Sequence, residues 1–465
     1  MTGPAASGPV PPGSSSSGPV PAEGGSSSRP LSSGSGSSGL VSPEGGSSSV
    51  PADGLPDEAF RPVFPAYGAG SLADLLPSVC AVLGIPGMAD VLGLRERLDG
   101  VDRIGVLLID GLGAYQLPLA APFAPTLASL CGAAASFGGA AVSPDGAAAS
   151  LGGGAVSPGG DAAYPGLATL TAGFPSTTPV SLVTIGTGVP PGEHGVLGFT
   201  VRRPDGRVLN HIHWADDPDP YQWQPIPTVL ERAAAAGSAV TLVSRSLYRG
   251  SGLSVAAHRG ARYQVADDGP AVAAEMLAAL RAGPGLVYGY HPDLDKAGHE
   301  DGVGSPAWEA AARGVDQILD QLAHGLPPGA AVLVTADHGQ LNVPAEGRYD
   351  LAAGPLAHGL IGVTGEPRVR YLHVADGALD DVVTTWREVL GDDARVLHRD
   401  EAIAEGWYGP VSRAHAARIG EVVVLCRGRA VVVASGWEPD RAGQLVAYHG
   451  SCTAAEMTVP MLIVR

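Results

Sequence analysis

The sequence predicts an α/β fold in which helices flank a mostly parallel central sheet. Four apolar runs without polar alternation are typical of strands covered on both faces, at residues 103–109, 239–244, 285–290 and 330–335. Ala- and Leu-rich stretches that favour helices lie between or after them, at residues 227–236, 271–282 and 307–322. Because strands that alternate with helices pair in parallel, these segments predict one α/β domain over residues 57–465.

The pattern changes to shorter segments over residues 343–448, which we expect to form a smaller, β-containing insertion. Apolar segments occur there at residues 368–374, 421–426 and 430–434. The last two are separated by only three residues, so a hairpin is expected. Residues 457–464 should then form a closing core strand, and Pro460 favours an edge position or a strand end.

Two stretches of low complexity lie outside this pattern. Residues 1–56 are almost entirely Ser, Gly, Pro, Ala and Val, so they bury too little apolar surface to fold, and we expect a disordered tail. Residues 132–166 contain an imperfect duplication, GGAAVSPDG at 138–146 and GGGAVSPGG at 152–160. Two copies are too few for a repeat architecture, and we interpret this stretch as an expanded Gly-rich surface loop.

Composition and charge limit the class of partner. The net charge of −18 argues against a nucleic-acid polymer as partner, because phosphate backbones require basic surfaces. A small anionic substrate is still compatible, since bound metals can supply positive charge locally. We see neither a basic segment followed by an apolar one at the N-terminus nor an apolar run of 18 residues. A cytoplasmic protein without a membrane partner is therefore expected, and its oligomeric state stays open.

The four cysteines are widely separated and form no CxxC pair. Two disulfides are conceivable, but a chain of 465 residues can bury a core without them. We expect buried free thiols at Cys80, Cys131, Cys426 and Cys452.

Carboxylates and imidazoles follow three of the predicted strands. Asp110 comes directly after the run at 103–109, and Asp337 and His338 come just after the run at 330–335. Asp295 and His299 follow the run at 285–290, and their i, i+4 spacing places them on one helix face. Ligands of α/β sheets gather beyond the carboxyl ends of the strands, so we expect these five side chains to converge.

Two further residues complete a possible site for phosphoryl transfer. Thr178 precedes a stretch that favours a helix, where the helix dipole and backbone N–H groups can bind a phosphate oxygen. A threonine hydroxyl is a poor nucleophile near neutral pH, and a metal ion activates it by lowering its pKa. His449, near the C-terminus, is a further candidate metal ligand.

Each of these residues also has a purely structural interpretation. Asp110 could form a turn or cap a helix, Thr178 could be an ordinary N-cap, and His449 could be a structural histidine. Their joint occurrence nevertheless favours a centre with two divalent ions.

Six motifs in this order resemble the nucleotide pyrophosphatase/phosphodiesterase branch of the alkaline phosphatase superfamily. They are DG at 110–111, FPSTT at 174–178, GVPPGEHG at 188–195, YHPDLDKAGH at 290–299, DHG at 337–339 and HG at 449–450. The resemblance covers roughly residues 100–465 apart from the Gly-rich loop.

The resemblance implies two zinc sites and a covalent mechanism. One zinc ion would be held by Asp295, His299 and His449. The other would be held by Asp110, Asp337 and His338 together with the nucleophile Thr178. Thr178 would attack phosphorus to give a phospho-threonine intermediate, which water then releases. The expected substrate is a small, nucleotide-like phosphodiester or pyrophosphate.

One departure from the family pattern leaves the oxyanion contact open. Members often carry an Asn shortly after the HG of the third motif, whereas this chain has none before Asn210. The backbone N–H of Thr178, the side chain of Asn210 or a cation such as Arg202 could contact the phosphate oxygen instead.

Other functions on the same core remain alternatives, chiefly a phosphomonoesterase or a phosphonate hydrolase. A sulfatase is disfavoured because FPSTT lacks the Cys/Ser-x-Pro-x-Arg motif, and a non-catalytic scaffold because all seven chemical positions are filled. A dehydrogenase is disfavoured because DGLGAYQ lacks the third glycine of a dinucleotide loop. Pocket and structural roles both stay open for three histidines and one aromatic cluster, namely His211, His213, His358 and the cluster of Trp214 and Trp223 with Tyr221.

Overall fold

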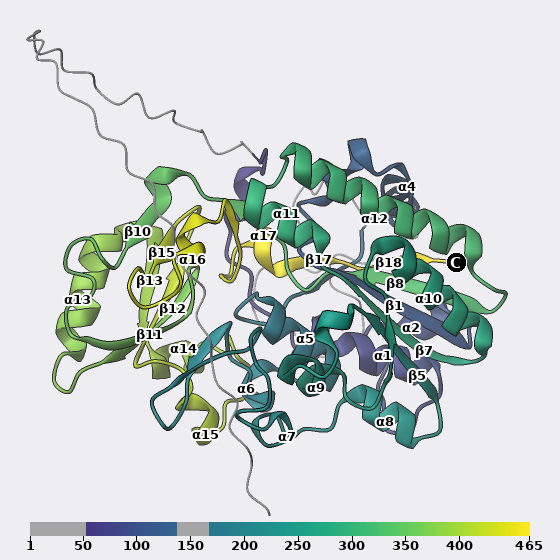
Figure 1. The fold of residues 1–465 in the computed structure, drawn as a ribbon, viewed down its shortest axis with the longest axis horizontal. Helices are drawn as coiled ribbons and strands as arrows, with labels where there is room; N and C mark the ends of the chain where they lie inside the picture. The colour runs from purple at the N-terminus through teal and green to yellow at the C-terminus, as the bar shows by residue number, and fades with distance from the viewer. Residues whose placement is uncertain (1–52, 137–166) are drawn as a thin grey trace, which may run out of the picture. The chain divides into compact units, whose positions relative to one another are not determined.

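A computed structural model describes residues 53–136 and 167–465, and its main element is a six-stranded sheet (Figure 1). The strand order is β18-β8-β1-β7-β5-β6. In that order the strands are Leu462–Val464, Ala330–Thr335, Arg103–Ile109, Gly285–His291, Ala239–Ser244 and Arg262–Val265. All neighbouring pairs are parallel except β18 with β8, which is antiparallel. The predicted mostly parallel sheet is confirmed.

Helices cover both faces of this sheet, as the unalternated apolar strands require (Figure 1). One group consists of α4 (Pro125–Ser136), α10 (Gly269–Ala282), α11 (Asp293–Asp301) and α12 (Pro306–Gly325). The other consists of α1 (Leu75–Val82), α5 (Thr178–Thr187), α8 (Val229–Ala235) and α9 (Gly252–His258). Short helices elsewhere are α2 (Leu94–Arg97), α3 (Leu117–Ala120), α6 (Pro191–His194), α7 (Pro220–Trp223) and α15 (Arg413–Ala416).

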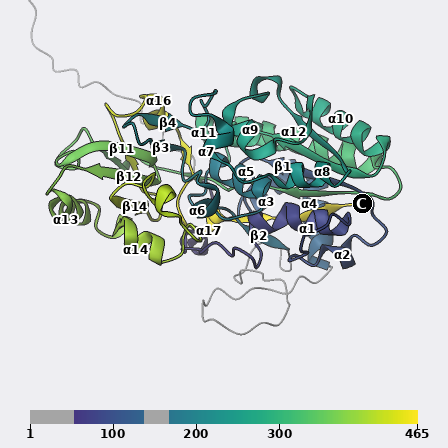
Figure 2. The same cartoon turned by 90° about the horizontal axis from the view of Figure 1, so that it is seen from below.

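A smaller antiparallel sheet lies beside the large one in both views (Figures 1 and 2). Its order is β11-β12-β14-β13, with strands Leu360–Glu366, Val369–Val374, Val422–Cys426 and Ala394–His398. Helix α13 (Leu379–Leu390) buries Trp386 against it and so forms a second hydrophobic core. Helices α14 (Arg399–Ala404) and α16 (Arg441–Gln444) also belong to the region that the sequence marked as a smaller insertion.

Two expectations for this region are wrong. The expected hairpin of residues 421–426 and 430–434 does not form, because β12 and β13 already occupy both edges of β14. The second segment, β15 (Val431–Val433), pairs in parallel with β10 (Arg348–Asp350) instead. The expected single strand at 457–464 is divided at Met461 into β17 (Thr458–Pro460) and β18.

Two of three further strand pairs connect distant parts of the chain, and the third is a local hairpin. Strand β17 pairs with β2 (Thr169–Thr171), and α17 (Ala454–Met457) precedes it. Strand β16 (Ala447–Tyr448) pairs with β9 (Leu341–Asn342), and β3 (Thr200–Arg202) forms a hairpin with β4 (Val208–Asn210). The β16–β9 pair brings the chain just before His449 close to the segment that follows His338.

Folded structure begins before residue 57, the expected start of the domain. Asp53 is buried, accepts a hydrogen bond from the backbone N–H of Asn342 at 2.9 Å, and pairs with Arg429. Residues 1–52 of the expected tail lie outside the described residues, as do residues 137–166 of the Gly-rich loop. Gly132, the expected start of that loop, still belongs to α4.

The cysteine prediction is confirmed, because all four thiols are free and buried. Among residues 53–136 and 167–465, no helix combines the length and apolar character needed to cross a bilayer. The cytoplasmic location stays a prediction.

His258 provides a test of the packing between α9 and the sheet. Its ring lies 4.9 Å from that of Tyr288 on β7, and its buried Nε2 has no hydrogen-bond partner. Burial lowers the pKa of His258 from 6.5 to about 4. Between these values the unfolded chain binds more protons than the folded one, so the free energy of unfolding falls as pH decreases.

We expect His258→Leu to flatten this pH dependence between pH 6.5 and pH 4. The reduction in slope should be about 1.4 kcal/mol per pH unit, measured by urea unfolding. His324→Leu, which removes a solvent-exposed imidazole on α12, should keep the wild-type slope. If the free energy of unfolding varied equally with pH in wild type and His258→Leu, the lowered pKa of His258 would be contradicted.

Candidate metal centre

The three strands that precede the predicted ligands are adjacent in the sheet. β1 lies between β7 and β8, and the last residues of the strands are in register, Ile109 with His291 and Leu108 with Thr335. Their carboxyl ends therefore meet at one edge, and the side chains that follow them converge there. The expected convergence of five side chains is confirmed.

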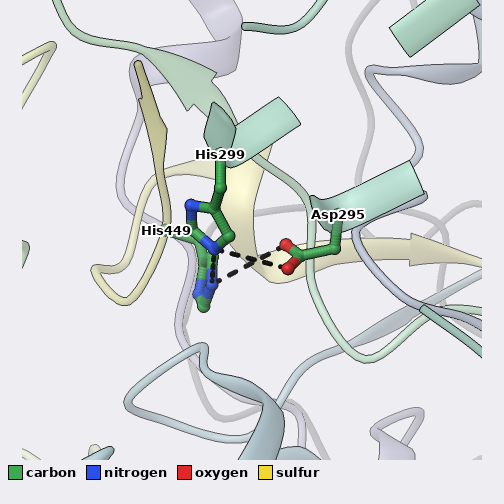
Figure 3. Close-up of side chains that lie close together, drawn as sticks. All are labelled: Asp295, His299 and His449. Carbon is green, nitrogen blue, oxygen red and sulfur yellow. Dashed lines mark hydrogen bonds and ion pairs between the residues drawn. The ribbon is translucent and has the colours of Figure 1, made fainter. Parts of the chain in front are cut away.

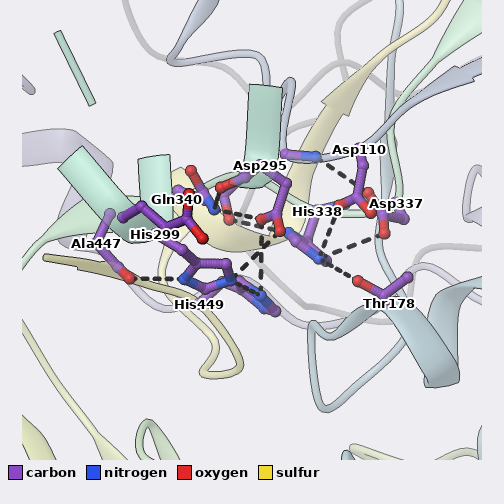
Figure 4. A network of polar contacts seen from close by, with 12 residues as sticks. Asp110, Thr178, Asp295, His299, Asp337, His338, Gln340, Ala447 and His449 are labelled. Atoms are coloured by element: carbon purple, nitrogen blue, oxygen red, sulfur yellow. Dashed lines mark hydrogen bonds and ion pairs between the residues drawn. The ribbon is translucent and has the colours of Figure 1, made fainter. Parts of the chain in front are cut away.

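The first cluster contains Asp110, Asp337 and His338, all of them buried. His338 Nε2 lies 3.3 Å from Asp337 Oδ2 and 3.6 Å from Asp110 Oδ1. The hydroxyl oxygen of Thr178 lies 3.1 Å from the same nitrogen (Figure 4). Four side chains that could each supply a metal ligand thus lie around one point.

The second cluster contains Asp295, His299 and His449 (Figure 3). His299 Nε2 lies 3.3 Å from Asp295 Oδ2, and His449 Nε2 lies 3.8 Å from Asp295 Oδ1. The rings of His338 and His449 are stacked with their centroids 3.6 Å apart, so the two clusters adjoin.

Backbone contacts fix the orientation of the two imidazoles in the second cluster. His299 Nδ1 lies 2.8 Å from the carbonyl oxygen of Ala447, and His449 Nδ1 lies 2.9 Å from that of Ser176. A carbonyl oxygen only accepts, so each Nδ1 carries a proton, and in the neutral imidazole each Nε2 then presents a lone pair. The two Nε2 atoms are 3.1 Å apart, an arrangement that a shared cation stabilises and that two neutral acceptors disfavour.

The first cluster has a similar excess of acceptors. Asp110 Oδ1 and Asp337 Oδ2 are buried without a hydrogen-bond partner. Burial raises the pKa of both carboxyl groups, and the charge of Asp337 raises the pKa of Asp110 further. A divalent cation would supply the missing partner, and mixed carboxylate and imidazole donors match zinc. The residues present therefore fit two metal ions.

Thr178 is the first residue of α5, and this position decides between its two interpretations. The N-cap is Thr177, whose side chain makes no capping hydrogen bond. Thr178 is buried, and its hydroxyl lies beside His338 rather than on the backbone N–H groups of its own helix. An ordinary N-cap role for Thr178 is excluded.

A family model of type I phosphodiesterases and nucleotide pyrophosphatases matches residues 166–452. The chain belongs to this family.

Solved structures from related enzymes show the same fold. The inactive threonine-to-alanine variant of murine ectonucleotide pyrophosphatase/phosphodiesterase 5, in complex with AMP, has a TM-score of 0.57 and 16% identity, over 78% of this chain and 87% of that chain. Phosphonoacetate hydrolase from Sinorhizobium meliloti 1021, in complex with phosphonoacetate, has a TM-score of 0.56 and 19% identity, over 79% and 91%. No curated protein matches the chain.

Two residues whose side chains donate hydrogen bonds to carboxylates of the two clusters were not identified from the sequence of this phosphodiesterase-family chain. The Tyr290 hydroxyl donates to Asp110 Oδ2. The Gln340 amide donates to the side chain of Asp295 (Figure 4). Both had a signal in the sequence, since Tyr290 opens the YHPDLDKAGH motif and Gln340 directly follows DHG. Gly298 allows this contact, because a Cβ there would lie 1.9 Å from Gln340 Oε1.

The two substrate-binding candidates have no described contact with either cluster. Asn210 Oδ1 accepts hydrogen bonds from the backbone N–H groups of Ile212 and His213, at 2.9 and 3.1 Å. Arg202 is half-buried on β3. The pKa of His373 is lowered mainly by burial, and the charge of Arg202 lowers it further. Their role in binding the phosphate stays a prediction.

The remaining histidines and aromatic residues divide by burial. His211 is buried between the carbonyl oxygen of Gly198 and the indole N–H of Trp223, so it is structural. Trp214 and Trp223 are core residues, whereas Tyr221 is 57% exposed. His213 and His358 are both exposed.

We expect the purified protein to bind about two zinc ions per chain, because two donor clusters adjoin. His449→Ala removes one donor of the second cluster, so its zinc content should fall to about one ion per chain. Metal analysis after dialysis against buffered zinc measures this change.

His358→Ala is the matched control, because its exposed imidazole lies outside both clusters. An unchanged zinc content in His449→Ala would exclude His449 as a ligand.

Proposed function

We propose that this protein is a hydrolase with two zinc ions that cleaves phosphodiester or pyrophosphate bonds of a small, nucleotide-like substrate. One observation carries the proposal. The hydroxyl of Thr178 lies at the N-terminus of a buried helix and 3.1 Å from a nitrogen of the first donor cluster. A hydroxyl in this position can act as a nucleophile on a phosphate that the same centre binds.

The two clusters would each hold one ion, as the sequence resemblance implies. Asp110, Asp337, His338 and Thr178 form one donor set, and Asp295, His299 and His449 form the other. When bound, the ions lower the pKa of the threonine hydroxyl and of water, and they offset charge on the phosphoryl oxygens.

The residues of the chain perform the remaining steps. Thr178 Oγ1 forms a bond to phosphorus while the bond to the leaving oxygen breaks, and the leaving oxygen takes up a proton. The N-terminus of α5 favours the negative charge on the phosphoryl oxygens. Water then attacks the phospho-threonine, which restores the Thr178 hydroxyl and releases the phosphorylated product.

The charge of the chain and the ligands of its structural relatives support a small anionic substrate. A net charge of −18 disfavours long polyanions. One solved relative is in complex with AMP and another with phosphonoacetate, both of them small anions.

Phosphonate hydrolysis is the second candidate, because a phosphonoacetate hydrolase matches this fold with almost the same TM-score as the phosphodiesterase. A phosphonate carries a phosphorus–carbon bond, so a phosphonate substrate separates the two candidates directly.

We expect the zinc-loaded protein to cleave bis(p-nitrophenyl) phosphate faster than p-nitrophenyl phosphate or phosphonoacetate. Thr178→Ala should lower kcat for the diester by about 1,000-fold or more, because the nucleophile is lost. Steady-state release of nitrophenolate and phosphate measures these rates.

Thr187→Ala at the other end of α5 is the matched control, since its hydroxyl only bonds to the carbonyl oxygen of Val183. It should keep kcat within about threefold of wild type. Full diester activity in Thr178→Ala would refute the assigned nucleophile, and faster cleavage of phosphonoacetate would replace the diesterase with a phosphonate hydrolase.

A further inference from the structure

A buried carboxyl group outside both metal clusters contacts two of the six sequence motifs and the segment that follows a third. Glu366 ends β11 of the smaller sheet and is 5% exposed. Its Oε2 accepts a hydrogen bond of 3.0 Å from the backbone N–H of Phe199, which follows the HG of the third motif. Its side chain also lies against Thr177 and Gly450, the neighbours in sequence of Thr178 and His449.

The approach to Gly450 is close enough to require glycine. Gly450 has a φ of +131°, and a Cβ there would lie 2.7 Å from Glu366 Cγ. The carbonyl oxygen of Gly450 also accepts a hydrogen bond of 3.0 Å from the N–H of Ser176. This bond joins the segment just before Thr178 to the segment just after His449, and Glu366 packs against both segments.

Ion pairing does not explain why a carboxyl group is buried here. Arg368, just before β12, forms an ion pair of 2.7 Å with Glu456, and Arg370, on β12, forms one of 2.5 Å with Glu438. Within the described part of the chain, Glu366 has no cationic partner at ion-pair distance. Burying a carboxyl group without such a partner costs free energy, so packing alone would favour an apolar residue.

Two oxygen atoms beside the nucleophile lack partners of normal geometry. They are Glu366 Oε1 and Thr177 Oγ1, both buried. Burial raises the pKa of Glu366 to about 8, against the lowering effect of the Phe199 N–H. A single proton between these two oxygens would satisfy both, and it would link the smaller sheet to the residue before Thr178.

We infer that Glu366 is a positioning residue for the reaction proposed above. Its side chain accepts a hydrogen bond from the N–H of Phe199 and packs against Thr177 and Gly450. It thereby fixes the position of Thr178 relative to His449. The inference rests on the proposed function, because it assumes that Thr178 is the nucleophile. Displacing a reacting group by about 1 Å can lower a rate about 100-fold, so this contact matters for turnover.

The test compares truncations of two glutamates near β12, the buried Glu366 and the half-buried Glu438. Glu366→Ala should lower kcat for bis(p-nitrophenyl) phosphate by about 10- to 100-fold and leave KM within about threefold. Glu438→Ala, which breaks the ion pair with Arg370 but contacts none of the motifs, should keep kcat within about threefold. Glu366→Gln keeps the shape of the side chain and can donate to Thr177, so it should restore kcat to within about threefold of wild type.

Two results would overturn the inference. One is a wild-type kcat in Glu366→Ala, and the other is an equal loss in Glu366→Gln, because an effect of the charge itself is not positioning. If Glu366→Ala does not fold, Glu366→Asp withdraws the carboxyl group by one methylene and is judged by the same criteria.

Hydrogen exchange separates this inference from the proposed function. Peptides that cover residues 174–182 and 447–453 should exchange faster in Glu366→Ala than in wild type or Glu438→Ala. If wild type cleaves no diester but both peptides lose protection, the proposed function fails, whereas the packing of Glu366 against the two segments stands. If wild type is active and neither peptide changes, the positioning role fails alone.

Discussion

The arrangement of this protein depends on an excess of buried acceptors at one edge of the sheet. Asp110 and Asp337 each have a buried oxygen without a partner, and two imidazole nitrogens face each other across 3.1 Å. Such a set of groups is unfavourable by itself, because burial removes hydrogen bonds to water and no hydrogen-bond donor of the protein replaces them. Bound cations would resolve this conflict, and the stability of the centre would then be linked to metal binding.

Different parts of the fold hold the carboxylates and the imidazoles of this centre in place. Three neighbouring strands bring the carboxylates to one edge, which a parallel sheet achieves without special loop geometry. The imidazoles need more support, and they obtain it from backbone carbonyl groups at Ala447 and Ser176. The smaller sheet contributes Glu366, which lies against Thr177 and Gly450, the neighbours in sequence of Thr178 and His449.

The sequence predicted the centre better than its surroundings, for a physical reason. Asp110, Asp337 and His338 follow directly on buried strands, so knowing the strands was enough to place them together. The pairing of β14 depended on contacts with β12 and β13 that are remote in sequence, and the short spacing to β15 suggested a hairpin instead. Glu366 gave no signal, because its role depends on three turns that meet only in the folded chain.

The separation of His449 from the other ligands along the chain has a consequence for biosynthesis. The three residues of the first cluster lie before residue 339, whereas the second cluster lacks one of its imidazoles until residue 449 has been synthesised. A nascent chain that stalls between residues 338 and 449 would therefore contain all residues of the first cluster but only two of the three in the second.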